Sequence, residues 1–383
     1  MPFKYSIINS DKIVFKRLES GCARVIFIVV GSIFTIIGFS LIFLINNSDM
    51  MLSLIKFLFP TLGLIAIYTG IKFPSIQSKI TPDEIIFDNQ KGRIEINQKK
   101  SEVNTAYIYY DEIDNFIIQV KRRNSNNSTT SNTGSSYTYH VYLLKKDGGQ
   151  WELLNRSTES AAQEEITKIK SAINFSVKPV RESITLSASK KYNIFNNNLK
   201  TELIWRNKLG YGPLFLGLFA VFFIAVFSTI IKSINIPIFA YIVIGFILSV
   251  FVFVIGRLAI KMIKNAKTEY SLYISDTTLS YIEKDLSGGI KKDVRIPYSN
   301  LHSIAFSFDS ENTLRNMYIY THEQYKTKSS MKLSFSLNSI LDVYNFYKNL
   351  IILDFQNLTA VEALHLENYL QQQILELGKI EIA

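Results

Sequence analysis

The chain has 383 residues, enough for two or three domains, and 48% of them are hydrophobic. Its formal net charge of +10 does not indicate nucleic-acid binding, because the excess of Lys and Arg lies in four segments beside long apolar runs, at 1–24, 72–79, 200–208 and 257–267. The single cysteine, Cys22, excludes an intramolecular disulfide and a cysteine metal cluster.

Four apolar runs, at 25–45, 51–71, 214–231 and 236–255, each approach the ~20 residues that a membrane-spanning helix needs. Only 46–50 and 232–235 separate the two runs within each pair. This pattern predicts two transmembrane hairpins, at 25–71 and 214–260. We expect Lys56, near the start of the second run, to snorkel to the interface, with a role in ion or substrate transport as the alternative.

The basic flanks predict how these hairpins are oriented. Lys and Arg gather at the outer ends of each pair, and Lys232 is the exception in the turns. The positive-inside rule then places the N-terminus, the middle of the chain and the C-terminus in the cytoplasm. We therefore expect a multi-pass protein of the cell inner membrane whose basic flanks contact the anionic headgroups of the lipid bilayer.

Residues 76–175 are predicted to form a β-rich domain closed by a helix. Its strands are expected at 84–88, 93–96, 106–110, 116–120, 139–144 and 150–154, and its helix at 157–174. The last two strands form a hairpin across 145–149, and the polar stretch 124–136 is a loop. Residues 268–353 repeat this layout, with strands at 272–274, 279–282, 294–296, 304–308, 317–321 and 332–335 and a helix at 338–353.

Three further segments complete the predicted organisation. Residues 1–24 form a basic N-terminal segment in which 11–20 is expected to lie as a short interfacial helix. Residues 176–213 are a linker. Residues 356–378 keep apolar side chains at helical spacing and predict a C-terminal amphipathic helix, which docks on the second β-domain or on another subunit.

One local pattern occurs in both halves. A strand ends at a tyrosine, a polar residue caps a single helical turn, and an aliphatic residue returns to the core before the next strand. The residues concerned are Tyr110, Asp111 and Ile113 in the first half and Tyr298, Ser299 and Leu301 in the second half. The repeated pattern predicts two copies of one structural unit.

This order of strand, tyrosine turn, strand, hairpin and closing helix resembles the bacterial pleckstrin-homology-like (PH-like) domain, and its doubling resembles the membrane-flanked members of that family. The resemblance covers most of 25–353. It implies a fold class of α-helical transmembrane hairpins plus α+β domains, in which each hairpin precedes a PH-like β-barrel or sandwich capped by a helix. Eukaryotic relatives bind phosphoinositides through a basic first hairpin, but here Asp88 and Glu95 lie among the basic residues of that hairpin.

The sequence predicts no catalytic, cofactor-binding or metal-binding residues. The four histidines, His140, His302, His322 and His365, lack metal-ligand spacing, and known nucleotide-binding and hydrolase motifs are missing. The acidic run Asp111, Glu112 and Asp114 is a weak candidate for a divalent cation. The second copy of the pattern has Ser299, Asn300 and His302 in these places, which favours a purely structural turn.

The best candidate for contact with an anionic partner or a lipid headgroup is the basic run Lys121, Arg122 and Arg123, beside the polar loop. A solvated charge run is the alternative interpretation. Together these features predict a membrane-anchored, non-enzymatic scaffold that presents two PH-like domains for binding an unidentified protein or for self-association. The alternatives are a small oligomeric transporter or channel built from the hairpins, and a membrane-bound enzyme with its site on the β-domains.

Overall fold

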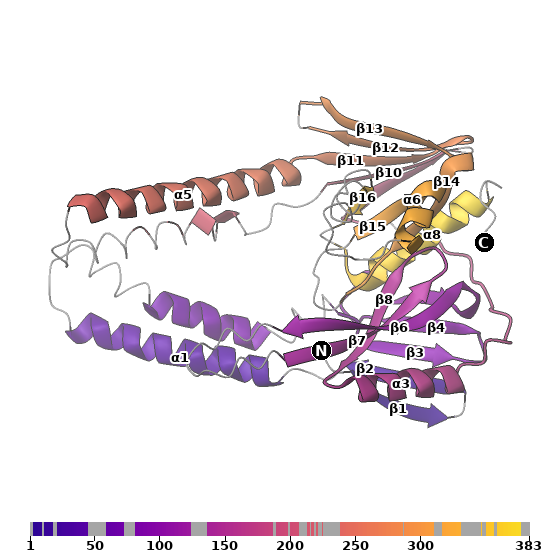
Figure 1. The fold of residues 1–383 in the computed structure, drawn as a ribbon, viewed down its shortest axis with the longest axis horizontal. Coiled ribbons are helices and arrows are strands. Elements are labelled where there is room, and N and C mark those ends of the chain that lie inside the picture. Colours follow the sequence, from indigo (N-terminus) through magenta and orange to yellow (C-terminus); the bar gives the residue numbers. More distant parts are fainter. Residues whose placement is uncertain are drawn as a thin grey trace.

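The computed structural model describes most of the chain. The described residues are 3–9, 11–17, 21–44, 59–72, 81–123, 136–186, 189–197, 200–206, 238–285, 287–309, 316–330, 350–355 and 358–376, with Phe346 and a few positions between 213 and 224. Over these residues the chain is an α+β protein with four antiparallel sheets. Figure 1 shows α1 and α5 projecting to the same side of a body formed by the sheets.

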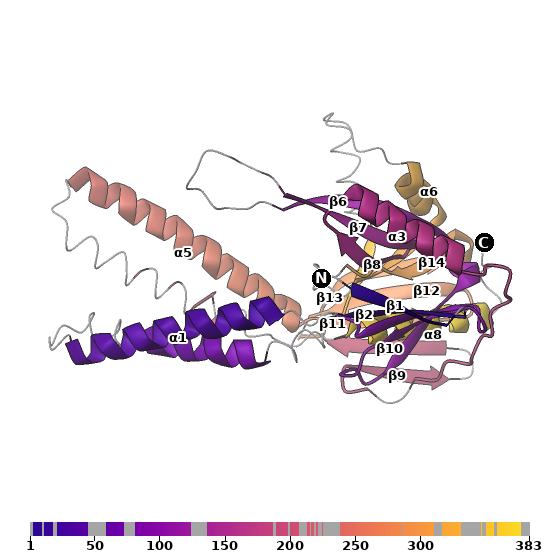
Figure 2. The same cartoon turned by 90° about the horizontal axis from the view of Figure 1, so that it is seen from below.

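The first half of the chain contains one five-stranded and one three-stranded sheet. The larger sheet has the order β1-β2-β3-β4-β5, made of Phe3–Asn9, Lys12–Arg17, Glu84–Asp88, Arg93–Asn97 and Thr105–Tyr109. The short helix η1 (Tyr110–Glu112) leads to the smaller sheet, β6 (Ile113–Arg123), β7 (Ser136–Lys145) and β8 (Gln150–Arg156). Helix α3 (Glu159–Ala172) packs on the smaller sheet (Figure 2).

The second half follows the same order. Its five-stranded sheet is β13-β12-β11-β10-β9, made of Ile290–Pro297, Thr278–Lys284, Glu269–Ile274, Lys200–Arg206 and Tyr192–Asn197. After η2 (Tyr298–Asn300) comes the sheet of β14 (Leu301–Phe306), β15 (Asn316–Thr321) and β16 (Ile351–Asp354). Helix α6 (His322–Ser330) follows β15, and α8 (Ala360–Glu376) closes the half.

In each half the long helices are inserted between the second and third strands of the large sheet. In the first half these helices are α1 (Gly21–Leu44) and the helix at 59–72. In the second half α5 (Ile238–Ala266) leads into β11. The predicted interfacial helix at 11–20 is wrong, because this stretch holds β2, where Ile13 and Phe15 lie opposite Phe87 and Ile85 in the core. Likewise, the segment 176–213, predicted as a linker, contains β9 and β10.

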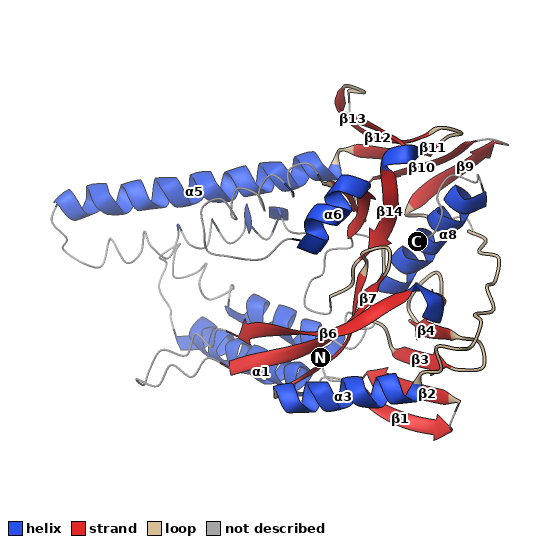
Figure 3. Ribbon diagram, turned by 45° about the vertical axis from the view of Figure 1, so that its right-hand side comes forward, coloured by secondary structure: helices blue, strands red, loops and turns tan. Residues whose placement is uncertain are grey.

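The helix predicted at 338–353 is wrong at its end, where β16 pairs with β15. The strand predicted at 332–335 and most of that helix lie outside the described residues. The helix that closes the second half is instead α8, within the stretch predicted as a separate C-terminal helix. It packs against β14 of its own half and also against β5 of the first half. Figure 3 shows α8 beside β14.

Over the residues that the structure describes, no helix combines the length and the apolar character needed to cross a membrane. This finding contradicts the predicted transmembrane hairpins at 25–71 and 214–260 and the multi-pass inner-membrane localisation with cytoplasmic termini. The transporter or channel alternative depended on the same spans. Lys56 lies outside the described residues.

Glycines bring α1 and the helix at 59–72 into close contact. A Cβ atom added to Gly31 would lie 2.7 Å from the carbonyl oxygen of Gly63 and 2.8 Å from the backbone nitrogen of Ile67. Since both neighbours are backbone atoms, they cannot turn aside as a side chain could. By contrast, among the described residues a Cβ atom on Gly256 of α5 would meet nothing within 4 Å outside the neighbouring turns of its own helix.

We therefore expect opposite effects from the same substitution at these two glycines. Gly256→Ala should raise the free energy of unfolding by up to about 1 kcal/mol, because alanine favours helix more than glycine does. Gly31→Ala should lower it by about 1–3 kcal/mol, because the helices must separate. Urea unfolding followed by circular dichroism measures both variants. Equal stabilisation by both would show that α1 and the helix at 59–72 do not approach each other closely.

The two halves share one hydrophobic core. Trp151 of β8 stacks on Phe308, just beyond β14, with the ring centroids 4.6 Å apart, and the two residues form a parallel β-bridge. The backbone nitrogen of Phe308 donates to Gln150 O (2.7 Å), and that of Glu152 donates to Phe308 O (3.0 Å). The two small sheets therefore meet edge to edge, which ties the halves to each other.

Candidate protein-binding site

The tyrosine pattern of both halves is part of the core. Tyr110 and Tyr298 are buried, and their hydroxyls donate to Asn89 Oδ1 (3.1 Å) and to Ser275 O (2.8 Å). Ile113 and Leu301 are buried where the next strand begins. In each half the pattern thus marks the passage from the large sheet to the small one and does not form a binding site.

The predicted capping role of Asp111 and Ser299 is wrong. The helical turns begin one residue earlier, at Tyr110 and Tyr298, and in the first turn it is Glu112 that accepts from the backbone nitrogen of Tyr109 (3.4 Å). Asp111 instead forms an ion pair with Arg181 (2.8 Å), and Ser299 is exposed. Within the described residues no group of three or more His, Cys, Asp or Glu side chains is placed to hold a metal ion.

The basic run beside the polar loop lies at the end of β6. Lys121 is half-buried and its ammonium group lies 2.6 Å from Asp309 Oδ2, which also accepts from the Tyr142 hydroxyl (3.0 Å). Arg122 is exposed, and the side chain of Arg123 lies outside the described residues. Because Asp309 offsets the charge of Lys121, the geometry does not single out this run as an anion site.

A buried cluster of charges holds the turn 145–149 of the first half against the second half. The Lys145 ammonium group lies 2.7 Å from Asp147 Oδ2 and forms an ion pair with Glu367 of α8. Glu367 also accepts from the backbone nitrogen of Phe306, and Gln371 donates to Asp147 Oδ2 (2.8 Å). Lys145 and Glu367 are buried and line neither of the clefts described below, so we interpret the cluster as structural.

Burial sets the protonation of this cluster. It raises the pKa of Glu367 to about 8, although Lys145 opposes the shift. Burial also raises the pKa of Glu112, whose carboxyl lies near Lys145 and Arg181, to about 7. Burial alone would raise the pKa of Asp147, but Lys145 and hydrogen bonds lower it by more, so this pKa lies below the ordinary value. One ammonium group therefore faces more carboxyl groups than it can neutralise.

The free energy of unfolding is therefore expected to fall as the pH rises from about 5 to about 8. In this range the folded state keeps a proton on Glu367, whose ordinary pKa is 4.5, while the unfolded state has released it. Glu112 acts in the same direction up to about pH 7. Urea titrations at several pH values measure the slope, and Glu367→Gln should flatten it. A stability that rises over this range would contradict the assignment.

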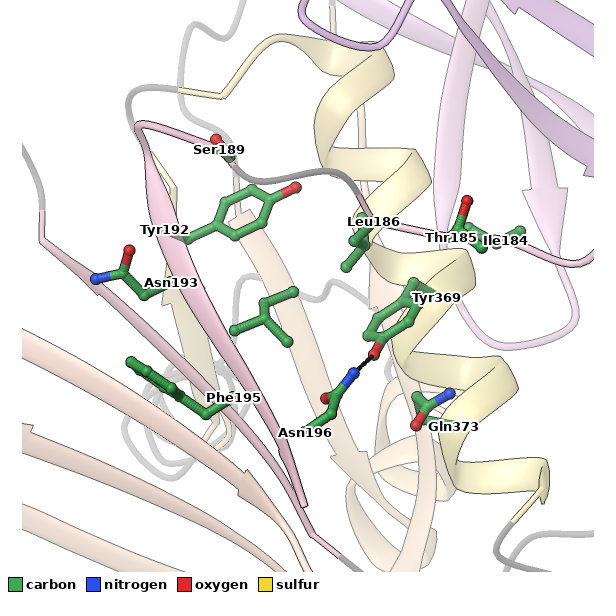
Figure 4. A pocket seen from close by; sticks show the side chains of 11 residues that line it. Ile184, Thr185, Leu186, Ser189, Tyr192, Asn193, Phe195, Asn196, Tyr369 and Gln373 are labelled. Carbon is green, nitrogen blue, oxygen red and sulfur yellow. Dashed lines mark hydrogen bonds between the residues drawn. The ribbon is translucent and has the colours of Figure 1, made fainter. Parts of the chain in front are cut away.

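The larger cleft, of about 610 Å³, lies between residues 184–186 and Ser189, strand β9 and helix α8 (Figure 4). Ile184, Leu186 and Ile194 give it an apolar floor. Asn196 donates to the hydroxyl of Tyr369 (2.9 Å) at one side. The other lining residues are Thr185, Ser189, Tyr192, Asn193, Phe195 and Gln373. An apolar floor with polar groups at the rim is typical of a site for a peptide or a small ligand.

A smaller cleft, of about 280 Å³, lies near the C-terminal half of α8. It contains Glu112 and Arg181, whose carboxylate and guanidinium groups lie 3.4 Å apart, and Arg181 also lies over the Tyr109 ring. A carboxyl group with a raised pKa in a cleft can serve in acid–base chemistry. Here Arg181 pairs with both Asp111 and Glu112, which favours a role in anchoring the segment after α3.

Strand β9 borders the larger cleft and is the edge of its sheet. Within the described residues it pairs only with β10, from Asn197 opposite Lys200 to Tyr192 opposite Trp205. Only two residues lie between the paired Asn197 and Lys200, so this pair exchanges backbone hydrogen bonds. From there on, pairs without and pairs with hydrogen bonds alternate along the two strands. The backbone N–H and C=O groups of Tyr192, Ile194 and Asn196 are therefore directed towards the open edge.

The other edges of the two large sheets are covered or charged. Helix α8 covers β5, where Asn368 donates to Tyr107 O (2.8 Å). Strand β13 carries Lys291, Lys292, Asp293 and Arg295, and β1 carries Lys4. Charged residues and covering helices are the usual protection of an edge against pairing with another strand. The β9 sequence, YNIFNN, has no charged residue, and Phe195 is 54% exposed.

No protein-family model matches the chain, and no curated protein matches its sequence. The geometry of the site is therefore the basis for a function.

Proposed function

We propose that this protein is a non-enzymatic scaffold that binds another polypeptide by strand addition at β9. The observation that carries the proposal is that β9 is an uncharged edge strand beside a cleft with an apolar floor. In strand addition the open N–H and C=O groups supply the affinity, and pockets for alternate side chains supply the specificity. The backbone groups of Ile194 and Asn196 and the adjacent cleft fit these two roles.

The resemblance to bacterial PH-like domains remains a prediction. The order of large sheet, tyrosine turn, small sheet and closing helix in both halves supports it. Such domains act by binding, which agrees with the proposed scaffold.

Binding of a labelled strand peptide tests the proposal. The probe is a fluorescein-labelled peptide with the sequence YNIFNN, followed by fluorescence anisotropy. Asn196→Pro removes an outward N–H group and also the hydrogen bond to Tyr369, whereas Tyr369→Phe removes only that hydrogen bond. We expect the wild-type protein and Tyr369→Phe to bind the peptide and Asn196→Pro to lose binding. Equal binding by both variants, or no binding by the wild-type protein at a dilution at which it is monomeric, would refute strand addition at β9.

A further inference from the structure

The chemistry of β9 also indicates which strand it pairs with. Two β9 strands would bring together two neutral surfaces, since the sequence YNIFNN contributes no like charges that would repel each other. The nearby Lys191 pairs with Glu362 of its own chain (2.5 Å), which offsets its charge beside the edge. An uncharged edge strand with open backbone groups is a template for an identical strand.

We propose that two copies of this chain pair through β9 in an antiparallel arrangement around a two-fold axis. This inference rests on the proposed strand addition and names its partner. A two-fold contact uses the same patch on both copies, so each residue pair occurs twice. The result is one continuous sheet that runs from β13 of one copy to β13 of the other.

The outward backbone groups fix the register of this pairing. Hydrogen-bonded pairs need outward-facing residues on both strands, and these are Tyr192, Ile194 and Asn196. The longest overlap then places Ile194 opposite Ile194 of the second copy, and Tyr192 opposite Asn196. Asn193 consequently lies opposite Phe195 in a pair without hydrogen bonds, where side chains come closest.

This register extends the apolar floor of the cleft. The Ile194 side chain lies on the cleft side of β9, and side chains of directly opposed residues lie on the same face of a sheet. Ile194 of the second copy therefore extends the apolar floor beside Leu186 and Ile184. The exposed ring of Phe195, which alternates with Ile194 along the strand, lies next to Asn193 of the second copy.

Two matched double variants test the proposal. In Asn193→Lys/Phe195→Lys, lysines lie opposite lysines in both pairs, whereas in Asn193→Lys/Phe195→Glu each lysine lies opposite a glutamate. Both positions are exposed, so each variant is expected to fold, which circular dichroism checks. Sedimentation velocity over a range of concentrations gives the mass. It is run in a detergent that covers the exposed apolar side chains of α1 and α5.

We expect the wild-type protein and the Lys/Glu variant to form dimers, and the Lys/Lys variant to dissociate with a dissociation constant about tenfold higher or more. A wild-type protein that stays monomeric while it still binds the YNIFNN peptide would overturn self-pairing and leave strand addition standing. A Lys/Lys variant that dimerises as well as the wild type would place the contact on another surface and overturn the inference. If the wild-type protein stayed monomeric and also failed to bind the YNIFNN peptide, the proposed function itself would be overturned.

Discussion

Replacing Lys145 by methionine is expected to lower the free energy of unfolding by about 3–5 kcal/mol. Among the described residues Lys145 is the ammonium group that pairs with Glu367, and it is also a partner of Asp147. The substitution leaves the buried Glu367 carboxyl and the largely buried, charged Asp147 carboxylate without it. An uncompensated buried charge costs more than a lost surface contact. Urea unfolding at pH 7 measures the change.

Two variants make this experiment specific. Lys146 is the exposed neighbour in the same turn, so Lys146→Met should change the free energy of unfolding by less than about 0.5 kcal/mol. Lys145→Met combined with Glu367→Leu removes both partners and should recover much of the loss. If Lys145→Met costs no more than Lys146→Met, the cluster does not hold the two halves together.

Replacing Trp151 by alanine should also cost about 3–5 kcal/mol, because it leaves a large cavity in the shared core. The side chain is 1% exposed and lies against Phe306 and Phe308 of the second half. The stacking contact itself should appear as a coupling of about 0.5–1.5 kcal/mol in a double-mutant cycle with Phe308→Ala.

The Trp151→Ala variant also reports on cooperativity between the halves. The chain has two tryptophans, and the remaining one, Trp205, stacks on Phe355 in the second half (4.4 Å). Since the halves share one core, the unfolding transition seen by Trp205 fluorescence should move to lower urea concentration in this variant. A Trp205 transition at its wild-type midpoint would mean that the halves unfold independently.

Strands with clear alternation could be predicted from the sequence. Glu84–Asp88 and Arg93–Asn97 lie within a residue of their expected bounds, because apolar residues such as Ile85 and Phe87 alternate with polar ones around a tight turn. That turn contains Gly92 in the left-handed region (φ 63°). The apolar runs did predict helices at α1, 59–72 and α5, but their assignment as membrane spans is contradicted.

The strands that precede the long helices could not be predicted in the same way. β2 pairs with β3 across the whole helical insertion, and β10 pairs with β11 across the other. No local turn links the partners, so the usual hairpin signal is missing. β16 is a short apolar run, which by itself fits a helix as well as a strand.

The candidate site was missed for a related reason. β9 lies in the segment predicted as a linker, and its neutral sequence YNIFNN gives a weak signal of alternation. That β9 is an edge strand follows from the order of all the strands in its sheet. No local sequence pattern encodes this order. Likewise, nothing in the run Lys145-Lys146 distinguishes the buried lysine from the exposed one, because α8, more than 200 residues later, covers only the first.

Residue-resolved hydrogen exchange in β9 tests the central claim most directly. At a dilution at which the chain is monomeric, the amides of Ile194 and Asn196 should exchange rapidly and those of Asn193 and Phe195 slowly, because only the latter pair with β10. At high protein concentration, or with the YNIFNN peptide, the Ile194 and Asn196 amides should become protected. Protection of all four amides in the dilute monomer, or no change on adding either strand, would contradict an open edge at β9.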